Sequence, residues 1–548
     1  MMWMRKGVCL IAALLAAVPA ASTAGTSLDE NLQKIKHVVV IYAENRSFDN
    51  IFGLFPGADG IGQALADPKR YRQVDHDGTV LQRLPPVWLD AKSDIPTPDP
   101  RFKSLPNAPF QIDDVNGPDM LMGERTRDLV HMFFQHKEQL DGGRLDKFAA
   151  VSDAGGLVMA YYDGRDLELS KLAQQYALAD HFFTGAFGGS FLNHMWLVCA
   201  CAPKYQAGMR DGIDYPPLDP ESDAARKSAS RRIAVLGDNM LLARAPDSRP
   251  SALDGPPVFE TPYASYFGNV EAGKLVYYAV NTLQPAYAPT RRKPAPGSPQ
   301  FADPSDPEDP DLNLRFGVLP PLVEETIGDR LEAKGTSWAW YAEGWDAAIA
   351  NPNVMYSDKL SGYPNFHPHH QPFNYFAKFS PATPQGRDER ARHLKDAGTF
   401  LADLENATGD FVAFYKPQGT YNQHPGYTDI TTGDRHIAKL IRDIMKTTAW
   451  ASTMIIVTYD ENGGFWDHVP PPAGGEWGPG SRVPAIIISP YSKCGIDSTP
   501  YDTTSIQKFL NRRFHLAPLP GLAERKFAGD LTAALDFTAA HPDGCPVK

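Results

Sequence analysis

The stretch GGSFLNH, residues 188–194, places Ser190 between two glycines and an Asn–His pair. A serine hydroxyl is a weak nucleophile with a very high pKa, so a base or a metal ion must activate it. The chain contains no G-x-S-x-G stretch, which disfavours the nucleophile elbow of α/β-hydrolases. Activation by a cation held among carboxylates remains, and it suits attack on phosphorus. The simpler alternative is a serine that caps a helix after a glycine turn.

Acidic and amide side chains follow two apolar runs that lie more than 400 residues apart. Glu44 and Asn45 come directly after the first run, and Asp460 and Glu461 come directly after the second. If these four side chains meet, their carboxylates repel one another unless a cation neutralises them. Carboxylate and amide oxygens suit one hard divalent ion, such as Ca²⁺, Mg²⁺ or Mn²⁺. The alternative is that each pair is a solvated strand end.

Histidines supply the next candidates. The stretch NFHPHHQPFNYF contains the adjacent pair His369 and His370, and NQHPGY contains His424. A lone histidine is usually a structural residue with an ordinary hydrogen-bond partner. An adjacent pair in an apolar segment can instead donate to phosphate oxygens or protonate a leaving group.

The apolar runs that carry these residues have the character of buried strands. HVVVIYAEN (37–45) and TMIIVTYDENGG (453–464) are rich in β-branched residues and end abruptly in polar side chains, and DFVAFYKP (410–417) and VPAIIISPY (483–491) are similar. Strands buried on both faces of a parallel sheet have this composition. Ligands of such sheets bind outside the carboxyl ends of the strands, which is where the polar residues stand.

Helical periodicity separates these strands. ELSKLAQQYAL (168–178) and RHIAKLIRDIMKTT (435–448) place apolar residues on one face. Strands that alternate with helices predict an α/β fold with a doubly wound, mostly parallel central sheet flanked by helices. Pro-rich stretches near residues 85–110 and 285–321 are expected to be surface insertions. Because the candidate site residues span so much of the chain, we expect one domain over 25–548.

Composition limits the classes of partner. The 548 residues are 43% hydrophobic and carry a net charge of −12, which is typical of a globular protein and disfavours nucleic-acid binding. Residues 1–24 combine a basic start, a short apolar stretch and small residues, which predicts a signal peptide and a periplasmic or secreted protein. The alternative is that the N-terminal stretch remains as an uncleaved anchor. No later stretch has about 18 uninterrupted apolar residues, so we expect no stable membrane anchor.

Four cysteines follow the expected signal peptide, and four cysteines allow three pairings. Cys199 and Cys201 lie in the apolar run MWLVCACA, where they can be buried thiols. Cys494 and Cys545 lie in polar loop sequence near the C-terminus. Export permits disulfides, and we expect the second pair to be bonded.

Six stretches together resemble the bacterial acid phosphatase/phospholipase C phosphoesterase family, within the alkaline phosphatase superfamily. In chain order they are HVVVIYAENRSFDNIFG, DKFAAVSDAGGLVMAYYD, ADHFFTGAFGGSFLNH, HHQPFNYF, HPGYTD and VTYDENGGFWDHVPPP. The resemblance runs over roughly residues 35–510, and the acid phosphatase branch is the more similar of the two. The phosphocholine-specific phospholipase C branch has a threonine at the nucleophile and additional C-terminal modules, whereas this chain has Ser190.

The resemblance implies roles for single residues. Ser190 becomes the nucleophile and a neighbour of the ion. The implied ligands of one divalent ion are Glu44, Asn45, Ser190, Asp460 and Glu461, where the family has either Asp or Glu at the last position. The implied phosphate pocket consists of His131, Asn281, His369, His370 and His424, with His369 or His370 protonating the leaving alcohol.

These expectations define three hypotheses. The first is an exported, metal-dependent acid phosphatase that hydrolyses phosphate monoesters through a phosphoserine intermediate. The second keeps the site but releases a phosphorylated head group from phospholipid, as a phospholipase C does. The third belongs to another class: a non-catalytic cell-surface binding protein in which the ion is structural. Turnover of monoesters, of phosphatidylcholine, or of neither distinguishes the three.

Overall fold

The structure is a computed structural model that describes most of the chain. The described residues are 27–89, 96–211, 213–215, 243–244, 248–260, 266–271, 274–290, 318–351, 354–355 and 365–546. The expected signal peptide, residues 1–24, lies outside them, and so do residues 291–317 of the expected insertion at 285–321.

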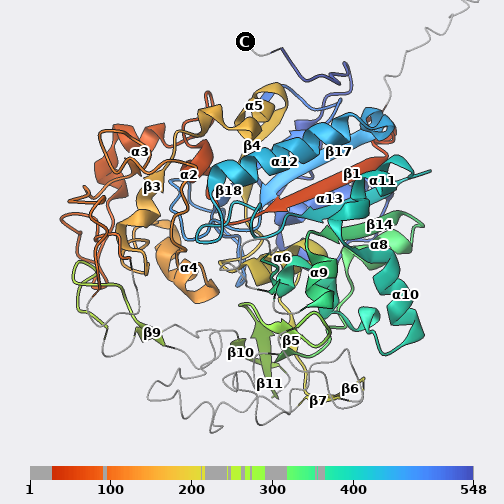
Figure 1. The fold of residues 1–548 in the computed structure, drawn as a ribbon, viewed down its shortest axis with the longest axis horizontal. Helices are drawn as coiled ribbons and strands as arrows, with labels where there is room; N and C mark the ends of the chain where they lie inside the picture. The colour runs from red at the N-terminus through yellow and green to blue at the C-terminus, as the bar shows by residue number, and fades with distance from the viewer. Residues whose placement is uncertain are drawn as a thin grey trace, which may run out of the picture.

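A nine-stranded sheet forms the centre of the described residues (Figure 1). The order across the sheet is β15 (Leu394–Lys395), β14 (Ser337–Ala342), β16 (Phe411–Lys416), β1 (His37–Ala43), β17 (Thr453–Tyr459), β18 (Arg482–Ile488), β4 (Ala177–Phe183) and β19 (Gly495–Asp497), and β20 (Tyr501–Asp502) also pairs with β4. Every residue of β1, β16, β17 and β18 is buried, as the apolar runs predict. The predicted mostly parallel α/β sheet is confirmed.

One strand differs from the expected direction. β18 runs antiparallel to both of its neighbours, β17 and β4, whereas β1, β14, β15, β16 and β17 are parallel to one another. A parallel neighbour needs a crossover connection, which is usually a helix. Residues 460–481 join β17 to β18 without a helix, so the chain returns beside β17 in the opposite direction.

Helices cover both faces of the sheet. In Figure 1, α12 (Ile430–Met445) lies in front of the strands and α13 (Thr503–Phe514) lies behind them. α12 packs against α5 (Glu168–Gln175), and α13 packs against α6 (Ser190–Cys199). α5 ends two residues before β4 begins, so the helix is shorter than its sequence pattern predicts, because Ala177 and Leu178 pair with β18 instead.

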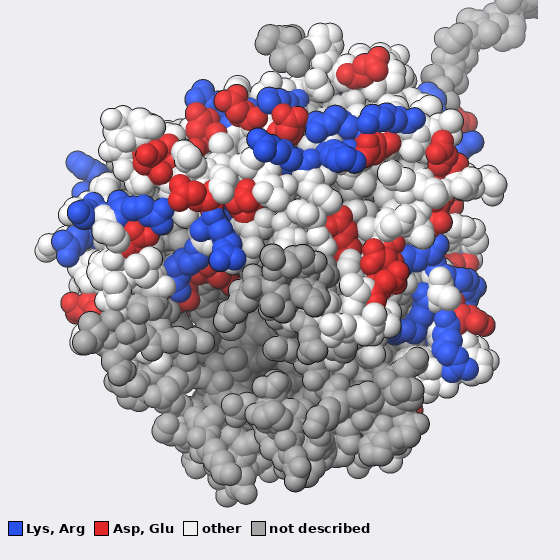
Figure 2. Space-filling model, viewed as in Figure 1, with Lys and Arg blue, Asp and Glu red and all other residues white. Residues whose placement is uncertain are grey.

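α12 shows why these helices form. Its inner face buries Ile437, Ala438, Ile441 and Ile444, and its outer face carries charges in ion pairs such as Lys439 with Asp443. Figure 2 shows basic side chains along this helix with acidic side chains among them. An apolar stripe on one face and charged pairs on the other are what a helix at the surface of a sheet needs.

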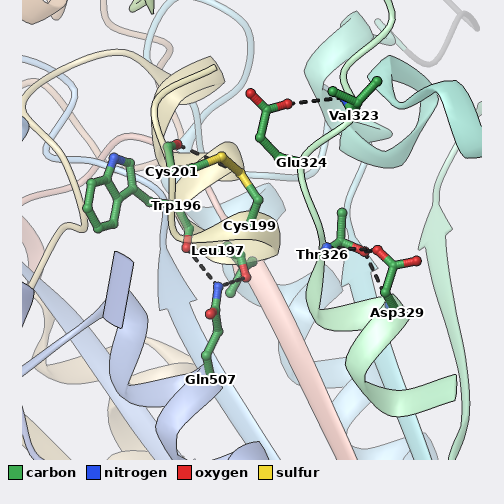
Figure 3. The surroundings of a disulfide bond; sticks show 9 residues. All are labelled: Trp196, Leu197, Cys199, Cys201, Val323, Glu324, Thr326, Asp329 and Gln507. Carbon is green, nitrogen blue, oxygen red and sulfur yellow. Dashed lines mark hydrogen bonds between the residues drawn. A yellow bond between two sulfur atoms is a disulfide. The ribbon is translucent and has the colours of Figure 1, made fainter. Parts of the chain in front are cut away.

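Both expected and unexpected disulfides are present. Cys494 is bonded to Cys545, as predicted, and Cys199 is bonded to Cys201 at the end of α6, where we allowed for free thiols. Ala200 adopts a left-handed conformation (φ 48°) that turns the chain back and brings the two cysteine Cα atoms to 5.2 Å. Figure 3 shows that Gln507 of α13 donates to the carbonyls of Trp196 and Leu197 beside this disulfide.

The remaining elements are short. The other helices are α1 (Leu28–Leu32), α2 (Phe48–Phe52), α3 (Gly62–Ala66), α4 (Phe133–Leu140), α8 (Ile327–Glu332), α9 (Trp345–Ala350), α10 (Pro384–His393) and α11 (Phe400–Glu405). Small pairs are formed by β2 (Phe110–Gln111) with β3 (Ala160–Tyr161), β6 (Gly208–Arg210) with β7 (Ile213–Tyr215), β8 (Ala243–Arg244) with β9 (Phe259–Glu260), and β12 (Gln284–Pro285) with β13 (Val318–Leu319), and a three-stranded sheet consists of β10 (Tyr266–Glu271), β11 (Lys274–Ala279) and β5 (Lys204–Tyr205). Among the described helices, none is both long enough and apolar enough to cross a bilayer.

Candidate active site

The carboxyl ends of β1 and β17 bring the two polar pairs together. The strands are parallel neighbours in register, with Ala43 opposite Tyr459. The next residues therefore meet: the Asp460 N–H donates to the Ala43 carbonyl (3.1 Å), and the Asn45 N–H donates to Asp460 Oδ1 (3.1 Å). Asn45 has a positive φ of 67°, which aims its side chain across the strand end and is often found at functional sites.

Ser190 is the first residue of α6 and points to the same place. Its hydroxyl donates to Glu461 Oε1 at 3.1 Å. The approach to the helix needs glycine: Gly188 and Gly189 have φ of 39° and 68°, and a Cβ on Gly188 would lie 2.5 Å from the Met132 backbone. The sequence therefore uses its glycines to bring a helix N-terminus close to a neighbouring loop.

Asn193 holds this loop in shape. Its side-chain oxygen accepts from the Ala186 N–H (2.8 Å), and its amide donates to the carbonyls of Gly188 and Gly189. Its neighbour His194 is buried, with Nδ1 2.7 Å from the Ser190 carbonyl. The Asn–His pair after the serine thus fixes the turn that presents the hydroxyl.

Three buried oxygens around Ser190 have no hydrogen-bond partner. They are Asn45 Oδ1, Asp460 Oδ2 and Glu461 Oε2. Burial and the neighbouring carboxylates raise the pKa of Asp460 to about 7 and that of Glu461 to about 8. A divalent cation would satisfy these oxygens and remove the repulsion, so this donor set fits a hard ion.

Glu44 stands in a different environment from the other acidic residues. Its Oε1 lies 2.8 Å from Lys416 Nζ and 2.9 Å from His370 Nε2, and its Oε2 accepts from Asn422 Nδ2 (2.6 Å). Burial raises the pKa of Glu44, but the charges of Lys416 and His370 outweigh it and hold the pKa well below its usual range. Glu44 is therefore an ionised carboxylate whose charge the protein itself neutralises in part.

Lys416 and Asn422 were not among the predicted residues. Lys416 is the last residue of β16, which pairs with β1, and its side chain is completely buried. The signal was in the sequence, because a lysine at the end of the buried run DFVAFYKP must have a buried anionic partner. Asn422 lies in an irregular loop, and nothing in its sequence surroundings marks it.

Two of the predicted histidines flank Asn45. His424 Nε2 lies 3.1 Å and His131 Nε2 3.4 Å from Asn45 Nδ2, and His131 Nε2 is 3.9 Å from Glu461 Oε1. Burial lowers the pKa of His131, but the charges of Glu461 and Asp128 outweigh it and raise the pKa to about 9. Burial lowers the pKa of His424 to about 3. His131 is thus cationic and His424 neutral at neutral pH.

The adjacent histidines lie at Glu44 rather than beside Ser190. His369 Nε2 is 3.5 Å from Glu44 Oε1, against 2.9 Å for His370. Burial lowers the pKa of both, to about 4 for His370. Asn281 lies near the serine loop: its Oδ1 accepts from the Phe133 N–H (3.2 Å), and its Nδ2 is buried without a hydrogen-bond partner.

Several groups of side chains in this region have metal-ligating atoms in reach of one another. Asp128, His131 and His424 form one such group, and His367, His369 and His370 form another. The predicted residues are therefore gathered in one buried region, with residues that can hold a cation beside a serine hydroxyl.

Comparison with known proteins gives the chain its family. The Phosphoesterase family matches residues 35–517. The chain is 24% identical to Phospholipase C B from Mycobacterium tuberculosis, over 93% of this chain and 79% of that protein. It is also 24% identical to the Non-hemolytic phospholipase C from Burkholderia pseudomallei, over 96% of this chain and 62% of that protein. A solved structure of a protein in the alkaline phosphatase superfamily from Vibrio parahaemolyticus aligns with 77% of this chain and 75% of that chain, at 10% identity and a TM-score of 0.29. Because the match covers most of its length, the chain belongs to the Phosphoesterase family.

Proposed function

We propose that this protein is an exported, metal-dependent acid phosphatase that hydrolyses phosphate monoesters through a phosphoserine intermediate on Ser190. One observation carries the proposal: the Ser190 hydroxyl donates to Glu461 beside three buried oxygens that lack partners. A serine that only caps a helix does not need buried carboxylates around it. A serine nucleophile needs them, because a base or a bound ion must activate its hydroxyl.

A single divalent ion is proposed to bind Glu44, Asn45, Ser190, Asp460 and Glu461. When bound, it would lower the pKa of the serine hydroxyl and offset negative charge that develops on the phosphate. Asn45 Oδ1, Asp460 Oδ2, Glu461 Oε2 and Glu44 Oε1 are buried without a hydrogen-bond partner, although Glu44 Oε1 also lies 2.8 Å from the Lys416 ammonium.

The chain's own groups supply the remaining steps. Ser190 Oγ attacks phosphorus, its proton passes to Glu461 Oε1, which the bound cation would keep ionised in acidic solution, and the P–O bond to the alcohol breaks. The N–H groups at the start of α6 and the cationic His131 face the region where the phosphate oxygens gain charge. Water then attacks phosphorus, the bond to Ser190 Oγ breaks, and Glu461 returns its proton to the serine oxygen, while the proton released by water goes to the histidine that protonated the alcohol.

The leaving alcohol needs a proton, and we assign this step to His369 or His370, as the family resemblance implies. Because burial lowers the pKa of both histidines, they hold a proton only in acidic solution. An acid that works only when protonated gives an activity that is highest at acidic pH. His131 is the pocket histidine that stays protonated at neutral pH, so we assign it to binding the phosphate, together with Asn281 and His424.

Phospholipase C activity is the second candidate, because both curated relatives carry that name. A panel of monoesters, diesters and phosphatidylcholine at pH 5 to 9, with and without chelator, separates the candidates. Chelator-sensitive turnover of monoesters alone supports the phosphatase, and release of a phosphorylated head group supports the phospholipase. Bound metal without turnover of any ester supports the non-catalytic binding protein.

We predict that Ser190→Ala reduces turnover by several orders of magnitude while the protein still folds. Thr383→Ala is the matched control, because Thr383 caps α10 through the Gly386 N–H and should cost about 1 kcal/mol of stability without loss of turnover. Acid quenching of the wild type during turnover should leave phosphate on the peptide containing Ser190. A Ser190→Ala variant that hydrolyses monoesters at the wild-type rate would refute the mechanism.

A further inference from the structure

A buried histidine lies between two glutamates at the edge of the sheet formed by β14 and β15. His393 is the last residue of α10, Glu389 stands one turn before it, and Glu332 ends α8. The cluster lies beside Trp338, near the amino end of β14, whereas the candidate active site lies at the carboxyl ends of β1 and β17.

Three atoms of this cluster converge on one point. His393 Nε2 is 3.1 Å from Glu332 Oε1 and 3.4 Å from Glu389 Oε2, and all three atoms lie within 4.8 Å of one another. His393 is only 7% exposed, and neither its Nε2 nor Glu389 Oε2 makes a hydrogen bond, although Lys378 Nζ lies 3.8 Å from Glu389 Oε2. The third atom, Glu332 Oε1, accepts from the Trp338 indole N–H (3.2 Å). Ligands of a tetrahedral ion at about 2.1 Å are about 3.4 Å apart, and the distances from His393 Nε2 to the two carboxylate oxygens, 3.1 and 3.4 Å, are close to this value.

The outer atom of each side chain is held by another group. His393 Nδ1 is 2.8 Å from the Trp338 carbonyl, which only an N–H can bond, so the lone pair of the neutral ring is on Nε2. Lys378 Nζ donates to Glu332 Oε2 (2.5 Å), and Arg392 donates to the outer oxygen of Glu389. Metal sites fix their ligands in this way, with the second nitrogen of histidine on a backbone carbonyl.

The elements that carry these side chains are firmly placed. Figure 3 includes the start of α8, where Thr326 and Asp329 form a capping box. The Trp338 ring stacks on the His393 ring at 4.2 Å and 11°. A cavity of about 700 Å³ is lined by Glu332, Glu389 and His393, and it gives an ion and its water a way in.

We propose that Glu332, Glu389 and His393 bind a divalent transition-metal ion of the zinc class, with water from the cavity as the fourth ligand. Imidazole nitrogen and carboxylate oxygen suit zinc, in contrast to the oxygen-only set around Ser190. The ion would join the ends of α8 and α10 at the edge of the sheet and, with water as its fourth ligand, would keep one position open to the cavity. The metal-free alternative is a protonated His393 paired with the two glutamates.

Zinc counting on the whole protein tests the proposal. Metal-stripped wild type, His393→Gln, Glu389→Gln and His436→Gln are dialysed against buffered Zn²⁺, and bound zinc and Tm are measured. His436 is the matched control, because it pairs with a single glutamate, Glu343, at 2.6 Å. We expect His393→Gln and Glu389→Gln to bind one zinc fewer than wild type and to lose the zinc-dependent rise in Tm, while His436→Gln keeps both.

Zinc that enters the oxygen site at Ser190 would be counted equally in wild type and in these variants, so it does not affect the difference. Turnover of His393→Gln should equal that of wild type, and Asp460→Asn should still bind the zinc at His393. Equal zinc content in wild type and His393→Gln overturns the proposal. If the variants do not fold, anomalous scattering at the zinc edge from wild-type crystals decides: a peak between the three side chains supports the site, and its absence overturns it.

Discussion

Glu44 and Lys416 form a completely buried ion pair at the strand ends of the candidate active site. Their charged atoms are 2.8 Å apart, and Lys416 Nζ also lies 5.4 Å from the centre of the Tyr42 ring. Desolvating two charges is costly, so such a pair adds little net stability, but removing one partner leaves the other charge buried alone. Lys416 thus supplies at the strand ends a fixed positive charge that needs no metal.

We predict that Lys416→Met lowers the free energy of unfolding by about 3 to 5 kcal/mol, because it leaves the Glu44 carboxylate without its ammonium partner. Denaturant unfolding at neutral pH measures the change. The double variant Lys416→Met/Glu44→Gln should recover much of the loss, since no buried charge remains. If the single variant is as stable as wild type, the carboxylate is neutralised by other groups.

At the scale of elements, the loop between β4 and α6 depends on a histidine in α4. The Gly188 N–H donates to His136 Nδ1 (2.7 Å), and His136 Nε2 lies 2.8 Å from the Ser481 hydroxyl. Because Nδ1 accepts a hydrogen bond, the ring must be neutral. Burial lowers the pKa of His136 to about 3.

This lowered pKa gives stability a pH dependence. The unfolded chain binds a proton at His136 below about pH 6.5, while the folded protein does not until about pH 3. The contribution of neutral His136 to the free energy of unfolding is therefore complete above pH 6.5. It falls by about 1.4 kcal/mol for each unit that the pH decreases within this window.

We predict that His136→Gln, which keeps an acceptor and a donor, unfolds with a weaker pH dependence than wild type. Free energies of unfolding between pH 4.5 and 7.5 should converge for the two proteins as the pH falls. Parallel curves would mean that His136 is charged in the folded state.

The elements with clear periodicity were predicted correctly from the sequence, and those decided by pairing were not. β1 and β17 are buried along their whole length, and α12 keeps the same face buried throughout, so the local sequence pattern is enough to predict their secondary structure. The end of α5 and the direction of β18 depend on which strand lies alongside, and residues distant in sequence decide that. The disulfide at Cys199 depends on a single left-handed residue, Ala200, which has no mark in the sequence.

The candidate site divides in the same way. Residues that follow strands, such as Asn45 and Asp460, were placed together correctly, because parallel strands share an edge. Partners that come from other segments, such as Lys416 and His136, depend on the packing of the whole molecule. The functional roles of these residues stay predictions, which the variants described above test.

At the scale of the whole molecule, the bond between Cys494 and Cys545 ties the C-terminal segment to the sheet. Cys494 precedes β19, which pairs with β4, and the two cysteines are 51 residues apart. A cross-link that closes a loop of this length lowers the conformational entropy of the unfolded chain, which raises the free energy of unfolding by about 4 kcal/mol.

We predict that replacing both Cys494 and Cys545 with serine lowers the free energy of unfolding by about 4 kcal/mol. The double serine variant at Cys199 and Cys201 is the matched control: its loop has a sequence separation of 2, so the same effect is less than half as large. Denaturant unfolding of both variants provides the comparison, and equal losses would show that the loop-closure explanation is wrong.

The position of β1 in the sheet determines when the protein can fold. β1 is the first strand among the described residues, yet its neighbours are β16 and β17, which are made some 370 residues later. At about 5 to 20 residues per second, a ribosome takes roughly 20 to 80 s to cover that distance. Throughout this time, seven residues that are entirely buried in the native protein have no partner. We expect a chaperone to cover residues 37–43 during synthesis, and the delay would keep the chain in the extended form that the proposed export through a translocation pore requires.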